Sequence, residues 1–177
     1  MKKHITLNEL ARRFKNIRLL ALDVDGVLTD DHIYFGPDGW EMKKFNISDG
    51  FFMVLAMRSG LEIAVVSGRV SKATTTRMKD LGVKYILQKM QDKRKQIKPL
   101  LKKLNISLDQ VAFMGNEILD IGLAQESGLS MAVADAAGEL KEVVDYVTDA
   151  RGGEGAVREI LKAYFKGMRL DPASYVV

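Results

Sequence analysis

Two aspartates one residue apart, Asp23 and Asp25, follow an apolar run that covers residues 19–22. Such a run is typical of a strand buried on both faces of a parallel sheet, and Gly26 indicates a sharp turn after the two acids. One carboxylate at such a strand end can attack phosphorus while the other moves a proton. Two anions this close also call for a divalent cation with oxygen ligands, and we expect Mg²⁺. A turn with two solvated acids is the alternative for this motif taken alone.

Polar residues also follow two later apolar runs. Ser67, Gly68 and Arg69 come after residues 62–66, and Asn116 comes after residues 110–114. A hydroxyl at a strand end can donate to a phosphate oxygen, and an arginine can pair with an anion. An asparagine can offer Mg²⁺ a neutral carbonyl oxygen. Each signal is weak alone, since a strand-ending turn explains it equally well.

Strand-like and helix-like patterns alternate along the chain. Helices are expected at 6–16, 49–58, 71–81, 93–103, 118–127, 138–143 and up to about 166, and strands at 17–23, 62–66, 85–87, 110–114, 129–133 and 146–148. This alternation predicts an α/β fold with a doubly wound parallel sheet, here as one domain over residues 1–177. Right-handed crossovers would then bring the polar strand ends to one edge of the sheet.

A hairpin is expected at residues 31–45, around the turn at 36–39. It carries the aromatic residues Tyr34, Phe35 and Trp40. We expect these side chains to pack against another subunit, which gives a homo-oligomer. A surface hairpin with its own small cluster is the alternative. The tail, residues 167–177, has little pattern and is expected either to be disordered or to reach a neighbouring active site.

The composition narrows the function classes. The 177 residues are 47% hydrophobic and 28% charged, with a formal net charge of +4, which suits an anionic ligand. Acids and bases are interleaved along the chain, so we expect no nucleic-acid partner. The chain has no cysteine, which excludes disulfides and thiolate chemistry. No apolar run reaches the roughly 18 residues of a membrane span, and residues 1–4 are not followed by the apolar segment of a signal peptide. We therefore expect a cytoplasmic protein.

The segment Leu19–Asp30, LLALDVDGVLTD, resembles the DxDGV signature of the haloacid dehalogenase superfamily, which consists mostly of phosphohydrolases. The resemblance extends from about residue 17 to 159. It is strongest to the 3-deoxy-D-manno-octulosonate 8-phosphate phosphatases of lipopolysaccharide sugar synthesis, whose GGxGAVRE motif occurs at residues 152–159. These enzymes lack a cap domain and form tetramers. The resemblance therefore implies a capless phosphatase in which residues 31–45 form only a small flap.

The resemblance also assigns roles to single residues. It implies Asp23 as the nucleophile, Asp25 as the acid and base, and Ser67 and Lys93 as phosphate-holding groups. Lys93 matches the family pattern better than Lys89 or Lys95. Substrate contacts are expected from Gly68, Arg69 and Asp49, Mg²⁺ ligands from Asp23, the Asp25 carbonyl and Asn116, and support from Glu117 and Asp120.

The chain departs from the superfamily pattern in two places. Asn116 and Glu117 stand where acids of a GDDxxD motif are usual, and Ser48 stands where a basic residue is usual. Three alternatives follow: a phosphatase of a nine-carbon ulosonate 9-phosphate, a weakly active binding or assembly domain, and a phospho-receiver domain. A receiver places its paired acids and its phosphorylated aspartate on different strands, and no second acidic strand end precedes Ser67.

Overall fold

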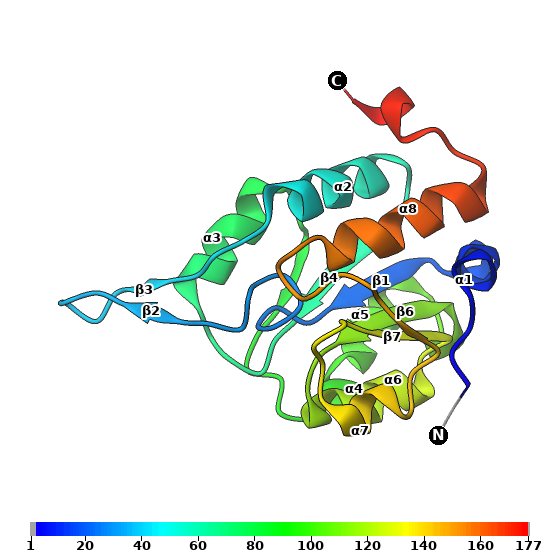
Figure 1. The fold of residues 1–177 in the computed structure, drawn as a ribbon. Coiled ribbons are helices and arrows are strands. Elements are labelled where there is room, and N and C mark those ends of the chain that lie inside the picture. The colour runs from blue at the N-terminus through cyan, green and yellow to red at the C-terminus, as the bar shows by residue number, and fades with distance from the viewer. Residues whose placement is uncertain (1–2, 177) are drawn as a thin grey trace.

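The computed structural model describes residues 3–176 and contains a six-stranded parallel sheet in the order β5-β4-β1-β6-β7-β8 (Figure 1). The strands are β1 (Leu19–Leu22), β4 (Glu62–Val66), β5 (Tyr85–Leu87), β6 (Val111–Gly115), β7 (Leu129–Ala132) and β8 (Tyr146–Val147). A separate antiparallel pair is formed by β2 (Tyr34–Phe35) and β3 (Glu41–Met42). The predicted α/β fold with a doubly wound parallel sheet is confirmed.

Strand β1 lies in the middle of the sheet, with β4 paired on one side and β6 on the other, both in parallel. Leu19 lies opposite Glu62 of β4 on one side and Val111 of β6 on the other. All four β1 residues are fully buried, as expected for a strand covered on both faces. The carboxyl ends of β1, β4 and β6 therefore meet at one edge of the sheet.

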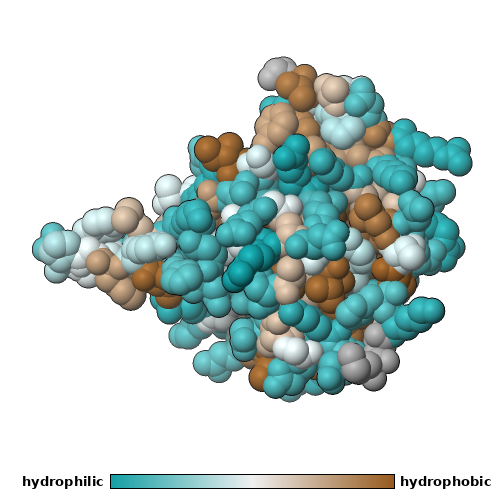
Figure 2. Space-filling model, viewed as in Figure 1, coloured by the Kyte–Doolittle hydropathy of each residue, from teal (hydrophilic) through white to brown (hydrophobic). Residues whose placement is uncertain are grey.

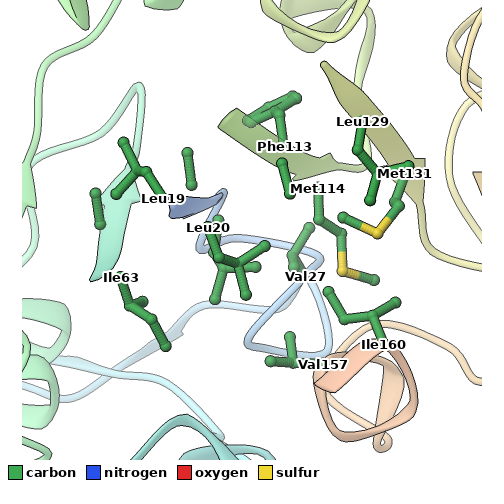
Figure 3. Close-up of a cluster of buried hydrophobic side chains, with 14 of the residues drawn as sticks. Leu19, Leu20, Val27, Ile63, Phe113, Met114, Leu129, Met131, Val157 and Ile160 are labelled. Atoms are coloured by element: carbon green, nitrogen blue, oxygen red, sulfur yellow. The ribbon is translucent and has the colours of Figure 1, made fainter. Parts of the chain in front are cut away.

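Helices cover both faces of this sheet (Figure 1). The α-helices are α1 (Leu7–Arg13), α2 (Ile47–Arg58), α3 (Lys72–Asp80), α4 (Lys93–Gln96), α5 (Lys98–Leu104), α6 (Ile121–Glu126), α7 (Gly138–Lys141) and α8 (Ala156–Met168). Helices α2, α3 and α8 lie on one face and α4–α7 on the other. Val157 and Ile160 of α8 pack toward Val27 and the β6–β7 methionines (Figure 3). No helix of the described residues 3–176 is long and apolar enough to cross a membrane.

Most predicted elements end within a few residues of the observed ones, and three of the differences have a clear local cause or form. The expected helix 93–103 is two helices, because Pro99 lies in the first turn of α5 and lacks the N–H that a continuous helix would need. Helix α2 begins at Ile47 rather than Asp49, since the Asn46 side chain caps it by accepting from two backbone N–H groups. The expected helix 118–127 begins with a 3₁₀ turn at 118–120.

The flap, residues 31–45, projects from the body of the molecule (Figure 1). Its strands have only two residues each, and apolar side chains lie among polar ones on its surface (Figure 2). The exposed apolar residues include Phe35, which is 67% exposed, together with Tyr34, Trp40 and Met42. A two-stranded hairpin is marginally stable alone, so the flap depends on its contacts with the domain.

The tail returns to its own chain. A 3₁₀ turn at Pro172–Tyr175 places the Tyr175 ring 6.0 Å from that of Phe165 in α8, and Arg58 of α2 donates to the Tyr175 carbonyl at 2.9 Å. The expectation of a disordered tail is therefore wrong up to residue 176. Val177 lies outside the described residues, as do Met1 and Lys2 in the segment considered for a signal peptide.

Two glycines before α8 bring the last part of the chain against the loop after β1. A Cβ on Gly152 would lie 1.8 Å from the Gly26 carbonyl oxygen, and one on Gly153 would lie 2.5 Å from the Thr29 carbonyl carbon. Gly153 also has a φ of +66°, which other residues adopt only with strain, and its N–H donates to the Val27 carbonyl at 2.9 Å. This contact fixes the loop that carries Asp25.

Candidate active site

Asp23 is held at the end of β1 by the backbone on both sides. Its N–H continues the sheet by donating to the Met114 carbonyl at 3.0 Å, and its Oδ1 accepts from the Val24 N–H at 2.7 Å. The side chain is largely buried, and Asp25 follows where the chain leaves the sheet. The two acids thus lie at the carboxyl edge of the central strand, where open α/β sheets bind ligands.

A buried lysine joins two of the acids. Lys93, the first residue of α4, places its Nζ 2.9 Å from Asp23 Oδ1 and 2.6 Å from Asp120 Oδ1. Asp120 is fully buried, and its Oδ2 accepts from the N–H groups of Asn116 and Glu117 at 2.9 and 3.1 Å. Asp120 therefore positions Lys93 and shapes the loop after β6 at the same time.

The protonation of Asp23 depends on these neighbours. Burial raises the pKa of the Asp23 carboxyl to about 7; Lys93 opposes this rise, and Asp120 adds to it. A carboxyl group with this pKa is only partly ionised at neutral pH. A divalent cation at this position would favour the ionised form, which is the form that attacks an electrophile.

The residues at the carboxyl edge fit such a cation. The Oδ1 atom of Asn116 is buried and has no hydrogen-bond partner, a costly state unless a ligand compensates it. The amide lies against the turn after Asp25, because a Cβ on Gly26 would meet Asn116 Nδ2 at 1.9 Å. Among residues 3–176 no three His, Cys, Asp or Glu side chains form a metal cluster. Asp23, the Asn116 amide and the Asp25 carbonyl offer oxygen donors of the kind that Mg²⁺ prefers.

The loop after β4 supplies the third side of the site. Ser67 is buried, and its hydroxyl accepts from the Arg69 N–H at 3.2 Å. Gly68 leaves room for its neighbours, since a Cβ there would lie 3.2 Å from Leu119. Arg69 directs its guanidinium to Asp25, with Nε 3.9 Å from Oδ2. The predicted set Ser67, Gly68 and Arg69 therefore lies beside the two acids.

Sequence reasoning missed Lys43, which follows β3 in the flap. Its side chain is fully buried and its Nζ forms an ion pair with Asp25 Oδ1. Glu41, two residues earlier, accepts from Arg69 Nη2 at 3.1 Å. Residues two apart on a strand lie on the same face. The spacing of Glu41 and Lys43 in a short flap was thus the signal that could have identified this pair.

Comparison with known proteins agrees with this geometry. A family model described as haloacid dehalogenase-like hydrolase matches residues 69–160. The 3-deoxy-D-manno-octulosonate 8-phosphate phosphatase of Escherichia coli K12 is 42% identical over 152 residues, which cover 86% of this chain and 81% of the relative. This chain belongs to the haloacid dehalogenase-like hydrolases.

Solved structures indicate the same family. The phosphatase of the same name from Yersinia pestis superposes with a TM-score of 0.88 at 37% identity, covering 91% of this chain and 87% of that chain. The Moraxella catarrhalis phosphatase of this name was solved with a magnesium ion, a phosphate ion and a KDO molecule. It superposes with a TM-score of 0.88 at 35% identity, covering 92% and 93% of the two chains. The resemblance inferred from the sequence is therefore confirmed.

Two residues assigned to the site of this hydrolase lie outside the cluster. Asp49 is only 1% exposed, and its Oδ1 accepts from the Arg158 N–H at 2.7 Å, in the first turn of α8. Its assignment as a substrate contact is not supported, because its carboxylate is directed into the protein. Glu117 is exposed and accepts from the Ile118 N–H at 3.3 Å, so it caps its own turn and Asn116 alone faces the acids.

Proposed function

We propose that this hydrolase is a Mg²⁺-dependent phosphatase that converts 3-deoxy-D-manno-octulosonate 8-phosphate to the free sugar acid and phosphate. The observation that carries this proposal is the buried contact of Asp23 with Lys93 beside the unpartnered Oδ1 of Asn116. A nucleophilic carboxylate, a buried ammonium and a free oxygen ligand are the groups that phosphoryl transfer needs. The substrate follows from the relatives of that name, which share 42% of their residues with this chain over most of its length.

The first chemical step uses both aspartates. An Asp23 oxygen forms a bond to phosphorus while the bond between phosphorus and the sugar oxygen breaks, which gives an aspartyl phosphate. Asp25 gives a proton to the departing oxygen. Lys93 and the Ser67 hydroxyl hold the phosphoryl oxygens. The bound Mg²⁺ supplies positive charge that stabilises the transferring group.

The second step reverses the proton transfer. Asp25 takes a proton from a water molecule whose oxygen attacks phosphorus, so that phosphate is released and Asp23 is restored. Asp25 is suited to both roles because it lies beyond the sheet, with its side chain more exposed than that of Asp23. A receiver domain places its paired acids and its phosphorylated aspartate on different strands, whereas Asp23 and Asp25 both follow β1.

A nine-carbon ulosonate 9-phosphate is the second candidate substrate. It is favoured by Ser48, where related enzymes carry a basic residue, and by the pair Asn116 and Glu117. Ser48 is exposed in the first turn of α2 and offers no charge to a substrate carboxylate. Asn116 lowers the negative charge of the metal site by one. The same departure motivates a weakly active binding or assembly domain as a third possibility.

The assembly is part of the same proposal. The flap exposes Tyr34, Phe35, Trp40 and Met42, and it stands away from the body of the molecule (Figure 1). Exposed apolar clusters of this kind are typical of subunit contacts. We propose a homo-oligomer, a tetramer, in which flaps pack together and shield a site that has no cap domain.

A steady-state phosphate-release assay tests the proposed function. The purified chain with Mg²⁺ is given the eight-carbon 8-phosphate and the nine-carbon 9-phosphate in parallel, and kcat/KM is compared. We expect the eight-carbon ester to be preferred. The matched control is Asp23→Asn, which keeps the shape but loses the nucleophile and should abolish turnover. Equal rates for wild type and this variant would refute the assignment of Asp23, and absence of turnover on both sugar acids would refute the substrate class.

A further inference from the structure

The flap places the buried ammonium group of Lys43 in the active site. The Lys43 side chain is fully buried, although it lies on the segment that leads from the exposed flap into α2. Lysine is almost never fully buried unless it is paired. The next residue, Lys44, is 62% exposed and pairs with Asp30 at 3.6 Å. The burial of Lys43 is therefore a property of this one position and not of the segment.

Three groups hold the Lys43 ammonium. Its Nζ contacts Asp25 Oδ1, lies 3.4 Å from the Thr74 hydroxyl of α3, and lies 3.8 Å from Glu41 Oε1. Glu41 is itself fixed, because the Ser71 hydroxyl donates to it at 2.5 Å and Arg69 donates at 3.1 Å. The flap and the start of α3 thus form a rigid cradle for one ammonium group.

We propose that Lys43 is a positioning residue that orients the Asp25 carboxylate for proton transfer at the leaving oxygen. Lys43 contacts Oδ1 of Asp25, whereas Arg69 Nε lies 3.9 Å from Oδ2, beyond hydrogen-bond distance. Lys43 therefore fixes one carboxylate oxygen and leaves Oδ2 to carry the proton. An aspartate just outside a strand would otherwise sample several rotamers. Placement of the reacting groups governs the efficiency of proton transfer.

A merely structural role for Lys43 would have different consequences. Attachment of the flap does not need an ammonium at Asp25, since Glu41 already joins β3 to Ser71 and Arg69. If Lys43 acts through Asp25, its loss will affect esters whose leaving oxygen needs a proton. It will spare aryl esters, whose leaving group departs without one. If Lys43 only supports the flap, both kinds of ester will be affected alike.

This inference rests on the proposed function, and the test uses three phosphate esters. Lys43→Met keeps the length of the side chain and removes the charge. We measure kcat/KM with Mg²⁺ on the octulosonate 8-phosphate, on 2-glycerol phosphate and on p-nitrophenyl phosphate. We expect a loss of roughly 30-fold on both alkyl esters, less than the loss of about 100-fold or more that removal of a general acid costs, because Asp25 itself remains. We expect a change of less than about fivefold on the aryl ester. Lys44→Met is the matched control and should change none of the three.

The outcomes separate the possible roles. Equal losses on all three esters in a protein with an unchanged unfolding temperature would overturn the proposal, as would no loss on any. A loss confined to the sugar-acid ester would make Lys43 a substrate contact and overturn it too. If Lys43→Met does not fold, Glu41→Gln tests the proposal instead. We expect its kcat/KM to decrease about tenfold on the alkyl esters alone. If the wild type does not hydrolyse the sugar-acid ester, the proposed function fails. The ratio of kcat/KM on the glycerol ester to kcat/KM on the aryl ester still tests the role of Lys43.

Discussion

Removal of the Lys93 charge should destabilise the protein as well as inactivate it. Lys93→Met leaves the buried carboxylates of Asp23 and Asp120 facing each other without the ammonium that lies 2.9 and 2.6 Å from them. Methionine fits the volume of the lysine stem and adds no polar group. The perturbation is therefore electrostatic.

The magnitude follows from the burial of all three groups. Loss of one partner of a buried ion pair typically costs about 3–5 kcal/mol. Asp23 can reduce this cost by taking up a proton, because its pKa is already raised to about 7, so we expect the lower value of about 3 kcal/mol. For a domain of this size each kcal/mol lowers Tm by roughly 2–4 °C. The expected decrease is about 6–12 °C.

Thermal unfolding at pH 7, followed by circular dichroism, measures this decrease. The matched control is Lys95→Met, two residues further on. Lys95 is 69% exposed and pairs with Asp92 at 3.0 Å, and such surface pairs are worth about 0–1 kcal/mol. The double variant Lys93→Met/Asp120→Asn should recover part of the lost stability, because it removes one of the two facing charges.

Two results would contradict this reasoning. A Tm for Lys93→Met within the range of Lys95→Met would mean that the buried ammonium does not offset carboxylate repulsion. A double variant less stable than Lys93→Met would mean that Asp120 acts through its hydrogen bonds to the loop after β6 alone.

Further variants test the metal site, the buried position of Asp49 and the assembly. Asn116→Asp should lower the Mg²⁺ concentration for half-maximal activity by adding a charged ligand, and Asn116→Ala should raise it at least about tenfold; a larger shift from Glu117→Ala would mean that the wrong ligand was chosen. Burial raises the pKa of Asp49 above 3.8, so its stability contribution is full below that pH and is lost as pH rises through the folded pKa. The Tm of Asp49→Asn relative to wild type should therefore rise between pH 4 and 7, with KM unchanged; a flat difference or a raised KM would contradict this placement. Phe35→Ser with Trp40→Ser should reduce the mass measured by light scattering to that of one protomer, and a wild type already monomeric at micromolar concentration would refute the oligomer.

The sequence predicted the sheet and the main site residues because each leaves a local signal. A fully apolar run that ends in Asp23 is typical of a central strand, and crossover handedness then places Ser67 and Asn116 at its carboxyl edge. Lys93 was chosen among the nearby lysines by the family resemblance. Asn116 and Asp120 were also placed correctly relative to Asp23, since they follow the neighbouring strand β6. These inferences needed no knowledge of distant contacts.

The remaining site contacts depend on tertiary packing. Asp49 and Lys43 are both charged residues near the start of α2, and only the two-residue spacing of Lys43 from Glu41 distinguishes their local patterns. The structure buries Asp49 against the N-terminus of α8 and Lys43 against Asp25. The residue that points into the site is decided by how the flap packs against α3. This packing brings together residues far apart in the sequence, and hydrophobic periodicity does not predict it. The tail was unpredictable for the same reason, because its order comes from Phe165 and Arg58.

The contact of Gly152 and Gly153 with the loop after β1 has a consequence for how activity appears during folding. The Asn46 side chain donates to the Gly153 carbonyl, although the two residues are 107 positions apart in the sequence. The Gly153 N–H donates to the Val27 carbonyl, and these two residues are even further apart in the sequence. Contacts between such distant residues close late, since loop-closure entropy opposes them. A chain emerging from the ribosome therefore carries both aspartates long before it can hold them in place. We therefore expect hydrolase activity to begin only when the last helix has docked.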